Sequence, residues 1–172
     1  MKKYASFFVL LFTVIFLNAC KKDQIVYKSD YAKSYQTWLD FKAATNNSYW
    51  YQVGTYSWTG YSTETTITVQ NGVVTKRAYV SKAVDQKTHA IVVLIEWTED
   101  KTSLNTHQDG ATIRTLDEIY LEAKNNWLLK RKDAETSFEA KNNGMISSCG
   151  YVENGCQDDC FTGISISSIE KL

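Results

Sequence analysis

Hydrophobic residues near the start of the chain recur at helical spacing. They lie three or four positions apart along one stretch, with one more aromatic residue beside them. These positions are Tyr31, Tyr35, Trp38, Leu39 and Phe41. The spacing predicts one helix, capped by Ser29 or Asp30 and ending near residue 44.

A second helical pattern follows the segment Thr115–Glu118. In such a capping box the Thr hydroxyl and the Glu carboxylate each bind a free backbone N–H group. The pattern predicts a helix that runs to about residue 129 with one apolar face. That face comprises Leu116, Ile119, Tyr120, Ala123 and Trp127. We interpret Lys130-Arg131-Lys132 as a cationic helix end, where positive charge favours the helix dipole.

Alternating or continuous β-branched and apolar residues predict seven strands. They cover residues 49–53, 65–70, 73–81, 90–97, 134–141, 145–151 and 162–169. Asn71-Gly72 predicts a tight hairpin because both positions favour positive φ, and Asn143-Gly144 gives the same signal. The nearly continuous apolar run 90–97 predicts a central strand covered, at least in part, on both faces. Adjacent Ser167-Ser168 predict a bulge.

The order of these elements is helix, four strands, helix, three strands. Because it contains no β-α-β alternation, we expect an antiparallel sheet of six or seven strands with two helices packed on one face. The composition, 44% hydrophobic and 22% charged, is that of a globular chain. The absence of proline excludes a Pro-rich linker or a collagen segment. The prediction is a single α+β domain over residues 29–172.

Residues 1–19 have the pattern of an export signal. Lys2 and Lys3 precede an uncharged run over residues 4–17, which is short for a bilayer span of about 20 residues. The run ends in Leu17-Asn18-Ala19-Cys20, which resembles the lipobox of bacterial lipoproteins. In such signals the cysteine thiol takes a diacylglycerol, and a peptidase then cuts before the cysteine. We therefore predict a signal peptide (1–19), an acylated Cys20 and a tether (20–28); an ordinary cleaved signal or an uncut span is the alternative.

The expected location is the bacterial cell envelope, with the outer membrane as the first choice and the periplasmic or surface face left open. Two or more acyl chains, palmitate among them, give stable anchoring. Loss of residues 1–19 removes two lysines and no acid from a chain with 19 basic and 19 acidic residues. The weakly acidic remainder has no basic cluster of the kind that binds nucleic acid. The expected partners are therefore the bilayer and an envelope protein or glycan.

The order of several short motifs resembles a family of small bacterial lipoproteins called domain of unknown function 6174. The motifs are Asn47–Tyr51, Val69–Val74, Leu116–Ile119, Gly144, and Asp158-Asp159 ahead of Ile164-Ser165-Ile166. The resemblance covers about residues 31–172. It implies a small lipoprotein domain and no particular activity.

Three cysteines remain beyond Cys20. An oxidising compartment favours a disulfide, and Cys149 with Cys160 is the first candidate pair, with Cys156 as the alternative partner. A zinc site built on these three thiolates lacks the Cys-x-x-Cys pair and a nearby histidine, so no metal is expected. Glu153, Asp158 and Asp159 are interpreted as a solvated acidic loop.

Aromatic residues are dense between Tyr49 and Tyr61. Strand alternation gives Trp50, Tyr56 and Trp58 the same parity, which would place them on the open face of the sheet as a binding surface. Burial under the second helix, a loop or a neighbouring strand is the competing interpretation.

The sequence carries no recognised catalytic motif, and no cofactor is expected. Neither His89 nor His107 lies in a metalloprotease pattern, and no nucleotide-binding glycine loop is present. The first hypothesis is a membrane-anchored, non-catalytic binding or accessory module. An envelope hydrolase with carboxylates as acid and base is the alternative, and a purely structural or inhibitor-like lipoprotein is the third. An exposed aromatic stripe favours the first, a pocket with two carboxylates the second, and an evenly polar surface the third.

Overall fold

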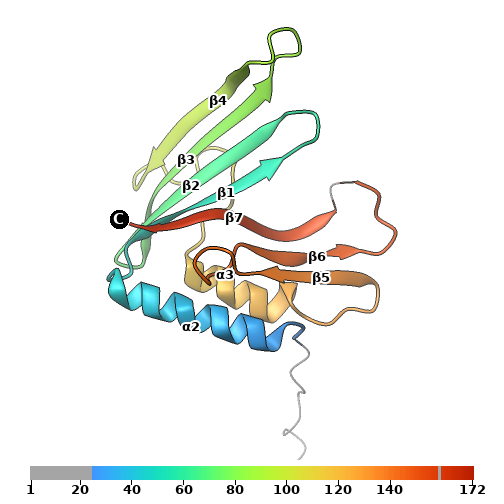
Figure 1. Cartoon of the computed structure of the whole chain (residues 1–172). Helices are drawn as coiled ribbons and strands as arrows, with labels where there is room; N and C mark the ends of the chain where they lie inside the picture. The colour runs from blue at the N-terminus through green and yellow to red at the C-terminus, as the bar shows by residue number, and fades with distance from the viewer. Residues whose placement is uncertain (1–24, 159) are drawn as a thin grey trace, which may run out of the picture.

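The computed structural model describes residues 25–158 and 160–172, and it forms one seven-stranded antiparallel sheet (Figure 1). The strands are β1 (Tyr49–Tyr56), β2 (Ser62–Gln70), β3 (Val73–Val84), β4 (Ile91–Asp100), β5 (Ala134–Glu139), β6 (Ser148–Glu153) and β7 (Phe161–Lys171). Their order across the sheet is β4-β3-β2-β1-β7-β6-β5. The predicted α+β class, with two helices on one face, is confirmed.

The expectations for the signal peptide, for Cys20 and for Asp159 lie outside the described residues. Within the described part of the chain, no helix combines the length and the hydrophobicity needed to cross a bilayer.

The first helix, α2 (Lys28–Ala44), ends where the spacing predicts but begins differently. Its N-cap is Tyr27, which has φ 60° and makes no side-chain cap, so neither Ser29 nor Asp30 serves as the cap. The helix buries Tyr31, Ser34 and Trp38 against the sheet and the second helix. Because no side chain caps the N-terminus of α2, the helix is stabilised mainly by burial of its apolar face.

The second helix, α3 (Leu116–Glu122), begins with the predicted capping box. The Thr115 hydroxyl accepts from the Glu118 N–H at 3.3 Å, and the Thr115 N–H donates to the Glu118 carboxylate at 2.6 Å. The helix then continues as one π-helical turn, η1 (Ala123–Trp127), in place of the straight helix expected to residue 129. All five residues of the predicted apolar face are buried.

The core lies between the sheet and these helices and is rich in tyrosine. The Tyr120 hydroxyl shares a 2.8 Å hydrogen bond with the Ser34 hydroxyl and accepts from the Ile146 N–H at 2.9 Å. The Trp38 ring meets the Tyr49 ring edge-on, with centroids 5.0 Å apart. Each buried hydroxyl in this group has a partner, which removes most of the cost of burying a polar atom.

Two glycine turns behave differently. Asn71 and Gly72 have φ of 50° and 80°, which confirms the predicted hairpin between β2 and β3. Asn143 and Gly144 also have positive φ, but their turn is closed by an isolated bridge between Asn142 and Met145. It lies inside a longer connection, so β6 begins at Ser148 and not at residue 145.

The predicted bulge is present where β7 meets β1. Gln52 lies opposite Ser168 and Val53 lies opposite Ile166, so Ser167 is the extra residue. The prediction for residues 90–97 is wrong, because β4 is an edge strand and not a central one. It is bonded only to β3 among the described strands, and its apolar residues from Ile91 to Ile95 are exposed. A continuous β-branched run indicates a strand but not the number of its neighbours.

Candidate functional site

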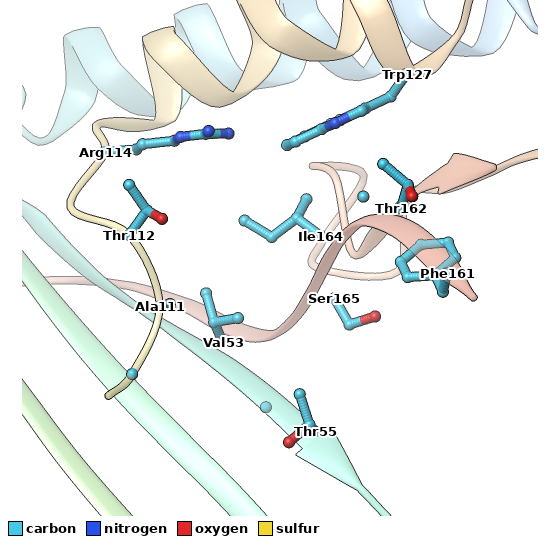
Figure 2. Close-up of a pocket in the computed structure, with 13 residues that line it drawn as sticks. Val53, Thr55, Ala111, Thr112, Arg114, Trp127, Phe161, Thr162, Ile164 and Ser165 are labelled. Carbon is cyan, nitrogen blue, oxygen red and sulfur yellow. The ribbon is translucent and has the colours of Figure 1, made fainter. Parts of the chain in front are cut away.

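A hollow lies in the fork between β1 and β7. The two strands pair from Tyr49 to Val53 and then separate: β1 continues beside β2 and β7 beside β6 (Figure 1). A cavity of about 450 Å³ occupies the fork and is bordered on one side by Gly110, Ala111, Thr112, Arg114 and Trp127 (Figure 2). Small-molecule sites in proteins have volumes of about 300–1,000 Å³. The fork pocket is therefore large enough for a small ligand or part of a larger one.

A second cavity adjoins the fork pocket. The two cavities share Gly54, Thr55, Phe161 and Ser165, and the second adds Tyr56, Ile166 and Ser167. The two cavities therefore adjoin each other between the diverging strands.

Among the described residues, Arg114 is the only charged side chain that lines the fork pocket. Its guanidinium carbon lies 5.7 Å from the centroid of the Trp127 ring, and the two side chains extend toward each other (Figure 2). None of the ion pairs among the described residues involves Arg114. A half-buried guanidinium without a carboxylate partner favours an anionic ligand.

The remaining lining is apolar or carries hydroxyl groups. The apolar contacts come from Val53, Ile164, Phe161 and the Trp127 ring. The hydroxyl groups belong to Thr55, Thr112, Thr162 and Ser165. Such a wall suits a ligand that joins an anionic group to an apolar part.

Two neighbouring core tyrosines hold the backbone next to Arg114. The Tyr51 hydroxyl donates to the Arg114 carbonyl at 2.6 Å, and the Tyr49 hydroxyl accepts from the Leu116 N–H at 2.8 Å. Both side chains lie on one face of β1 because they are two residues apart. Burial raises the pKa of each hydroxyl above its ordinary value, so both stay protonated at neutral pH. The position of Arg114 is thereby tied to β1.

Residues 110 and 111 rest on the sheet at the other end of this segment. The Ala111 N–H donates to the Thr65 hydroxyl at 2.9 Å, and the Ala111 carbonyl accepts from Arg77 at 3.3 Å. Gly110 has φ 88°, and a Cβ there would lie 3.2–3.4 Å from Thr65, Tyr79 and Trp97. Glycine is therefore favoured at this position for both its backbone conformation and its lack of a side chain.

A buried ion pair lies under the same segment. Arg77 on β3 binds Glu99 on β4 through two hydrogen bonds of 2.9 Å. Glu99 also accepts from the backbone N–H groups of His107 and Asn105, at 2.8 and 3.0 Å. Arg77 and these N–H groups hold the pKa of the Glu99 carboxyl far below its usual range, although burial alone would raise it. The ion pair therefore fastens the segment between β4 and α3 to the sheet.

The π-helical turn directs Trp127 into the pocket. Its hydrogen bond runs from the Leu128 N–H to the Ala123 carbonyl, at 2.9 Å. Arg131 donates to the Asn126 and Trp127 carbonyls at the end of this turn, and its guanidinium lies 3.6 Å from the Tyr151 ring centroid. The interpretation of residues 130–132 as a cationic helix end is confirmed for Arg131. Single π-helical turns are frequent at functional sites.

The cysteines pair differently from the first prediction. Cys156 and Cys160 form the disulfide, with Cα atoms 6.1 Å apart, so the first candidate pair, Cys149 with Cys160, does not form. Cys149 points into the core from β6 as a free thiol, and burial raises its pKa to about 12. A disulfide is present in the predicted part of the chain, but the sequence pattern does not indicate the direction in which the Cys149 side chain points. In the described part of the chain, no group of His, Cys, Asp and Glu could hold a metal ion.

The three residues of the predicted aromatic surface do not lie together along one strand. Trp50 is half-buried, Tyr56 is 72% exposed and Trp58 is 94% exposed. Trp58 lies in the turn after β1, while Trp50 and Tyr56 sit near its two ends, about 20 Å apart along the strand. Only Tyr56 lines a cavity at the fork. The binding role of this surface stays a prediction.

Sequence reasoning missed Arg114 and Trp127. Arg114 lies just before the capping box and Trp127 on the predicted apolar helix face, where each has a structural explanation. No spacing rule brings them together with β1 and β7, so no sequence signal for the pocket was present.

The chain matches no protein-family model, and searches of the curated proteins and of the solved structures also gave no match. The resemblance to domain of unknown function 6174 stays a prediction.

Proposed function

We propose that this protein is a lipid-anchored, non-catalytic binding module of the bacterial envelope whose fork pocket takes a ligand with a carboxylate or phosphate group. The observation that carries the proposal is Arg114, which lines the cavity, lies beside Trp127 and has no carboxylate partner among the described residues. Its planar guanidinium can bind either anion through two hydrogen bonds.

The pocket is held in shape before any ligand arrives. Tyr49 and Tyr51 fix the backbone on one side of Arg114, and the Arg77–Glu99 pair fixes the preceding segment. Binding then needs little ordering of the protein, which lowers its entropic cost. A rigid, pre-formed recess is what a binding or accessory module requires.

The hydrolase alternative finds no support in this cavity. The described lining contains no aspartate or glutamate, whereas carboxylate-dependent hydrolysis needs two of them about 5–10 Å apart. A purely structural role is also less well supported, because the surface is not evenly polar: Tyr56, Trp58 and much of β4 are exposed.

The test is calorimetric titration of the protein with inorganic phosphate, acetate and a longer fatty or aryl carboxylate. Arg114→Gln removes the charge and should weaken binding by about 1.5–3 kcal/mol, or roughly 10- to 150-fold. Lys124→Gln, which removes an exposed cation from η1 outside the pocket, is the matched control and should bind like the wild type. Equal affinity in the Arg114→Gln variant would refute the proposed site.

The anchor has a separate test. Cys20→Ala should abolish incorporation of labelled palmitate and release the protein from the membrane fraction, because that thiol takes the first lipid. Labelling that persists in the variant rejects the anchor and leaves the pocket proposal untouched.

A further inference from the structure

The fork exposes the backbone edges of both strands that form it. β1 and β7 stop pairing at Val53 and Ile166, and neither strand has another partner on that side among the described strands (Figure 1). In an antiparallel sheet, successive residues of a strand bond alternately to the neighbour on one side and to the neighbour on the other. One known bond on each strand therefore identifies the residues whose backbone groups point into the fork.

On β7, the backbone groups of Phe161 and Gly163 point into the fork. The Ile166 N–H donates to the Ser147 carbonyl at 2.7 Å, so the even-numbered residues of this part of β7 bond toward β6. The odd-numbered residues face the opposite way. Phe161 and Gly163 line the fork pocket, and no described strand pairs with them on this side.

On β1, the backbone groups of Tyr56 point into the fork from the opposite side. The Ser57 N–H donates to the Tyr61 carbonyl at 2.8 Å, on the side of β2. The Gln52 carbonyl accepts from the Ser167 hydroxyl at 3.3 Å, on the side of β7. Even-numbered residues of β1 therefore face β7, and Tyr56 lines the second cavity. The hollow is thus bordered by free edges of two strands.

A peptide is the class of ligand that matches both the free edges and Arg114. Another extended chain pairs with exposed backbone N–H and C=O groups, as in β-strand addition. Its C-terminal carboxylate is an anion that a guanidinium binds through two hydrogen bonds. Arg114 lines the same cavity as Phe161 and Gly163, so one ligand can contact all three residues. Charge and backbone pairing therefore favour the same occupant, the C-terminal end of a peptide.

The position of Arg114 sets the direction of such a peptide. The Arg114 carbonyl accepts from Tyr51, which lies in the part of β1 that still pairs with β7, so Arg114 enters the pocket from the closed end of the fork. Phe161 and Tyr56 lie at the open end, where β7 begins and β1 ends. A carboxylate on Arg114 places the C-terminus at the closed end. The peptide then runs antiparallel to β1 and parallel to β7.

We propose that the fork binds the last residues of an extended peptide, with the terminal carboxylate on Arg114, the last side chain against Trp127 and Ile164, and the backbone paired with the free edges of β1 and β7. From Phe161 to Ser165 the free edge is about 13 Å long, at about 3.3 Å per residue, which accommodates about four peptide residues. The inference rests on the proposed function, because both need Arg114, and it adds the class of ligand.

Calorimetric titration of the mature protein tests the role of the carboxylate. The probe is an N-acetylated tetrapeptide of three alanines and a C-terminal leucine, which suffices because the pairing uses backbone groups. The free acid should bind about 10- to 100-fold more tightly than its C-terminal amide. The difference should disappear in Arg114→Gln and persist in Lys124→Gln, whose exposed cation lies outside the pocket. Equal binding of acid and amide by the wild type, or binding of neither, overturns the inference.

A second titration tests the backbone pairing. Single N-methylation of either of the last two peptide bonds removes an N–H donor, and at least one of the two methylated peptides should bind about fivefold more weakly. Isocaproate, which keeps the carboxylate and side chain of leucine but has no peptide bond, should bind at least about tenfold more weakly than the tetrapeptide.

The same titrations separate failure of this inference from failure of the proposed function. If isocaproate and both methylated peptides bind as tightly as the tetrapeptide, the ligand does not pair with the strands and the inference is wrong. The proposed anion site then still stands, provided that Arg114→Gln weakens the binding of isocaproate. If Arg114→Gln binds isocaproate and the tetrapeptide like the wild type, the anion site and the peptide site are both refuted.

Discussion

Arg77 and Glu99 lie directly opposite each other on β3 and β4 and form a buried ion pair with two hydrogen bonds of 2.9 Å. The pair does more than join two strands. Arg77 also donates to the His107 and Ala111 carbonyls, at 2.9 and 3.3 Å. The segment that leads to Arg114 is therefore fastened to a charge pair about one residue in from the end of β4.

Replacement of Glu99 by Gln should destabilise the protein by about 3–5 kcal/mol, because it leaves the Arg77 charge buried without a counter-charge. Urea unfolding followed by circular dichroism measures the change. Glu135→Gln, on the exposed side of β5, is the control and should shift the unfolding free energy by no more than about 0.5 kcal/mol. Equal stability of the two variants would show that the ion pair does not hold the segment.

Acid should weaken the fold through the same carboxylate. The pKa of Glu99 in the folded protein lies below its value of about 4.3 in an unfolded chain. The unfolded state therefore takes up a proton first as the pH falls. The stability that Glu99 contributes is complete above about pH 5 and declines as the pH drops through 4. Unfolding titrations between pH 7 and 3 should show a flatter profile for Glu99→Gln than for the wild type; parallel profiles would contradict this cause.

The close approach of β6 and β7 depends on a glycine pair. Gly163 lies opposite Gly150, and a Cβ on Gly163 would overlap the Cys149 carbonyl and come within 2.6 Å of the Gly150 Cα. Gly163→Ala should cost about 1–3 kcal/mol in thermal or urea unfolding because backbone must move.

Gly54→Ala is the matched control for Gly163→Ala. Gly54 also lines the fork pocket, but the nearest neighbour of its added Cβ would be the movable Tyr56 ring, at 3.2 Å, and the Thr63 carbonyl would lie at an ordinary contact distance of 3.6 Å. Its stability should stay the same or rise by up to about 1 kcal/mol, since alanine restricts the unfolded chain. If Gly163→Ala and Gly54→Ala lose similar amounts of unfolding free energy, the close strand spacing at Gly163 does not explain the loss.

Cys149 should be chemically silent in the folded protein. Burial raises the pKa of its thiol to about 12, so almost none of it is thiolate at neutral pH. A colorimetric thiol assay of the mature, acylated protein should detect no thiol in buffer and one in guanidinium without reductant. Rapid reaction of a thiol in the folded protein would contradict the pairing of Cys156 with Cys160 or the burial of Cys149.

Local patterns predicted most of the fold. The helical spacing of residues 31–41, the capping box at Thr115 and the Asn71-Gly72 turn each depend on neighbours a few residues apart, and all three are confirmed. The Ser167 bulge was predicted for the same reason, because a break in alternation is visible within one strand.

The features that the sequence did not predict depend on contacts between residues that are far apart in the sequence. The run 90–97 has the composition of a buried strand, and only the order of the sheet shows that β4 lies at its edge. Arg77 and Glu99 meet because of hairpin register, and Arg114 meets Trp127 because a π-helical turn changes the direction of the ring. None of these relationships has a spacing that a sequence pattern could reveal.

Nuclear magnetic resonance of the indole N–H groups tests the fork pocket most directly. The chain has five tryptophans, and the Trp127→Phe variant assigns the signal of Trp127. Titration with an anion that binds should shift the Trp127 indole resonance and leave that of Trp58 unchanged, and the shift should vanish in Arg114→Gln. Saturable binding that moves the Trp50 or Trp58 resonance, and not that of Trp127, would contradict the account and place the ligand on the outer aromatic surface.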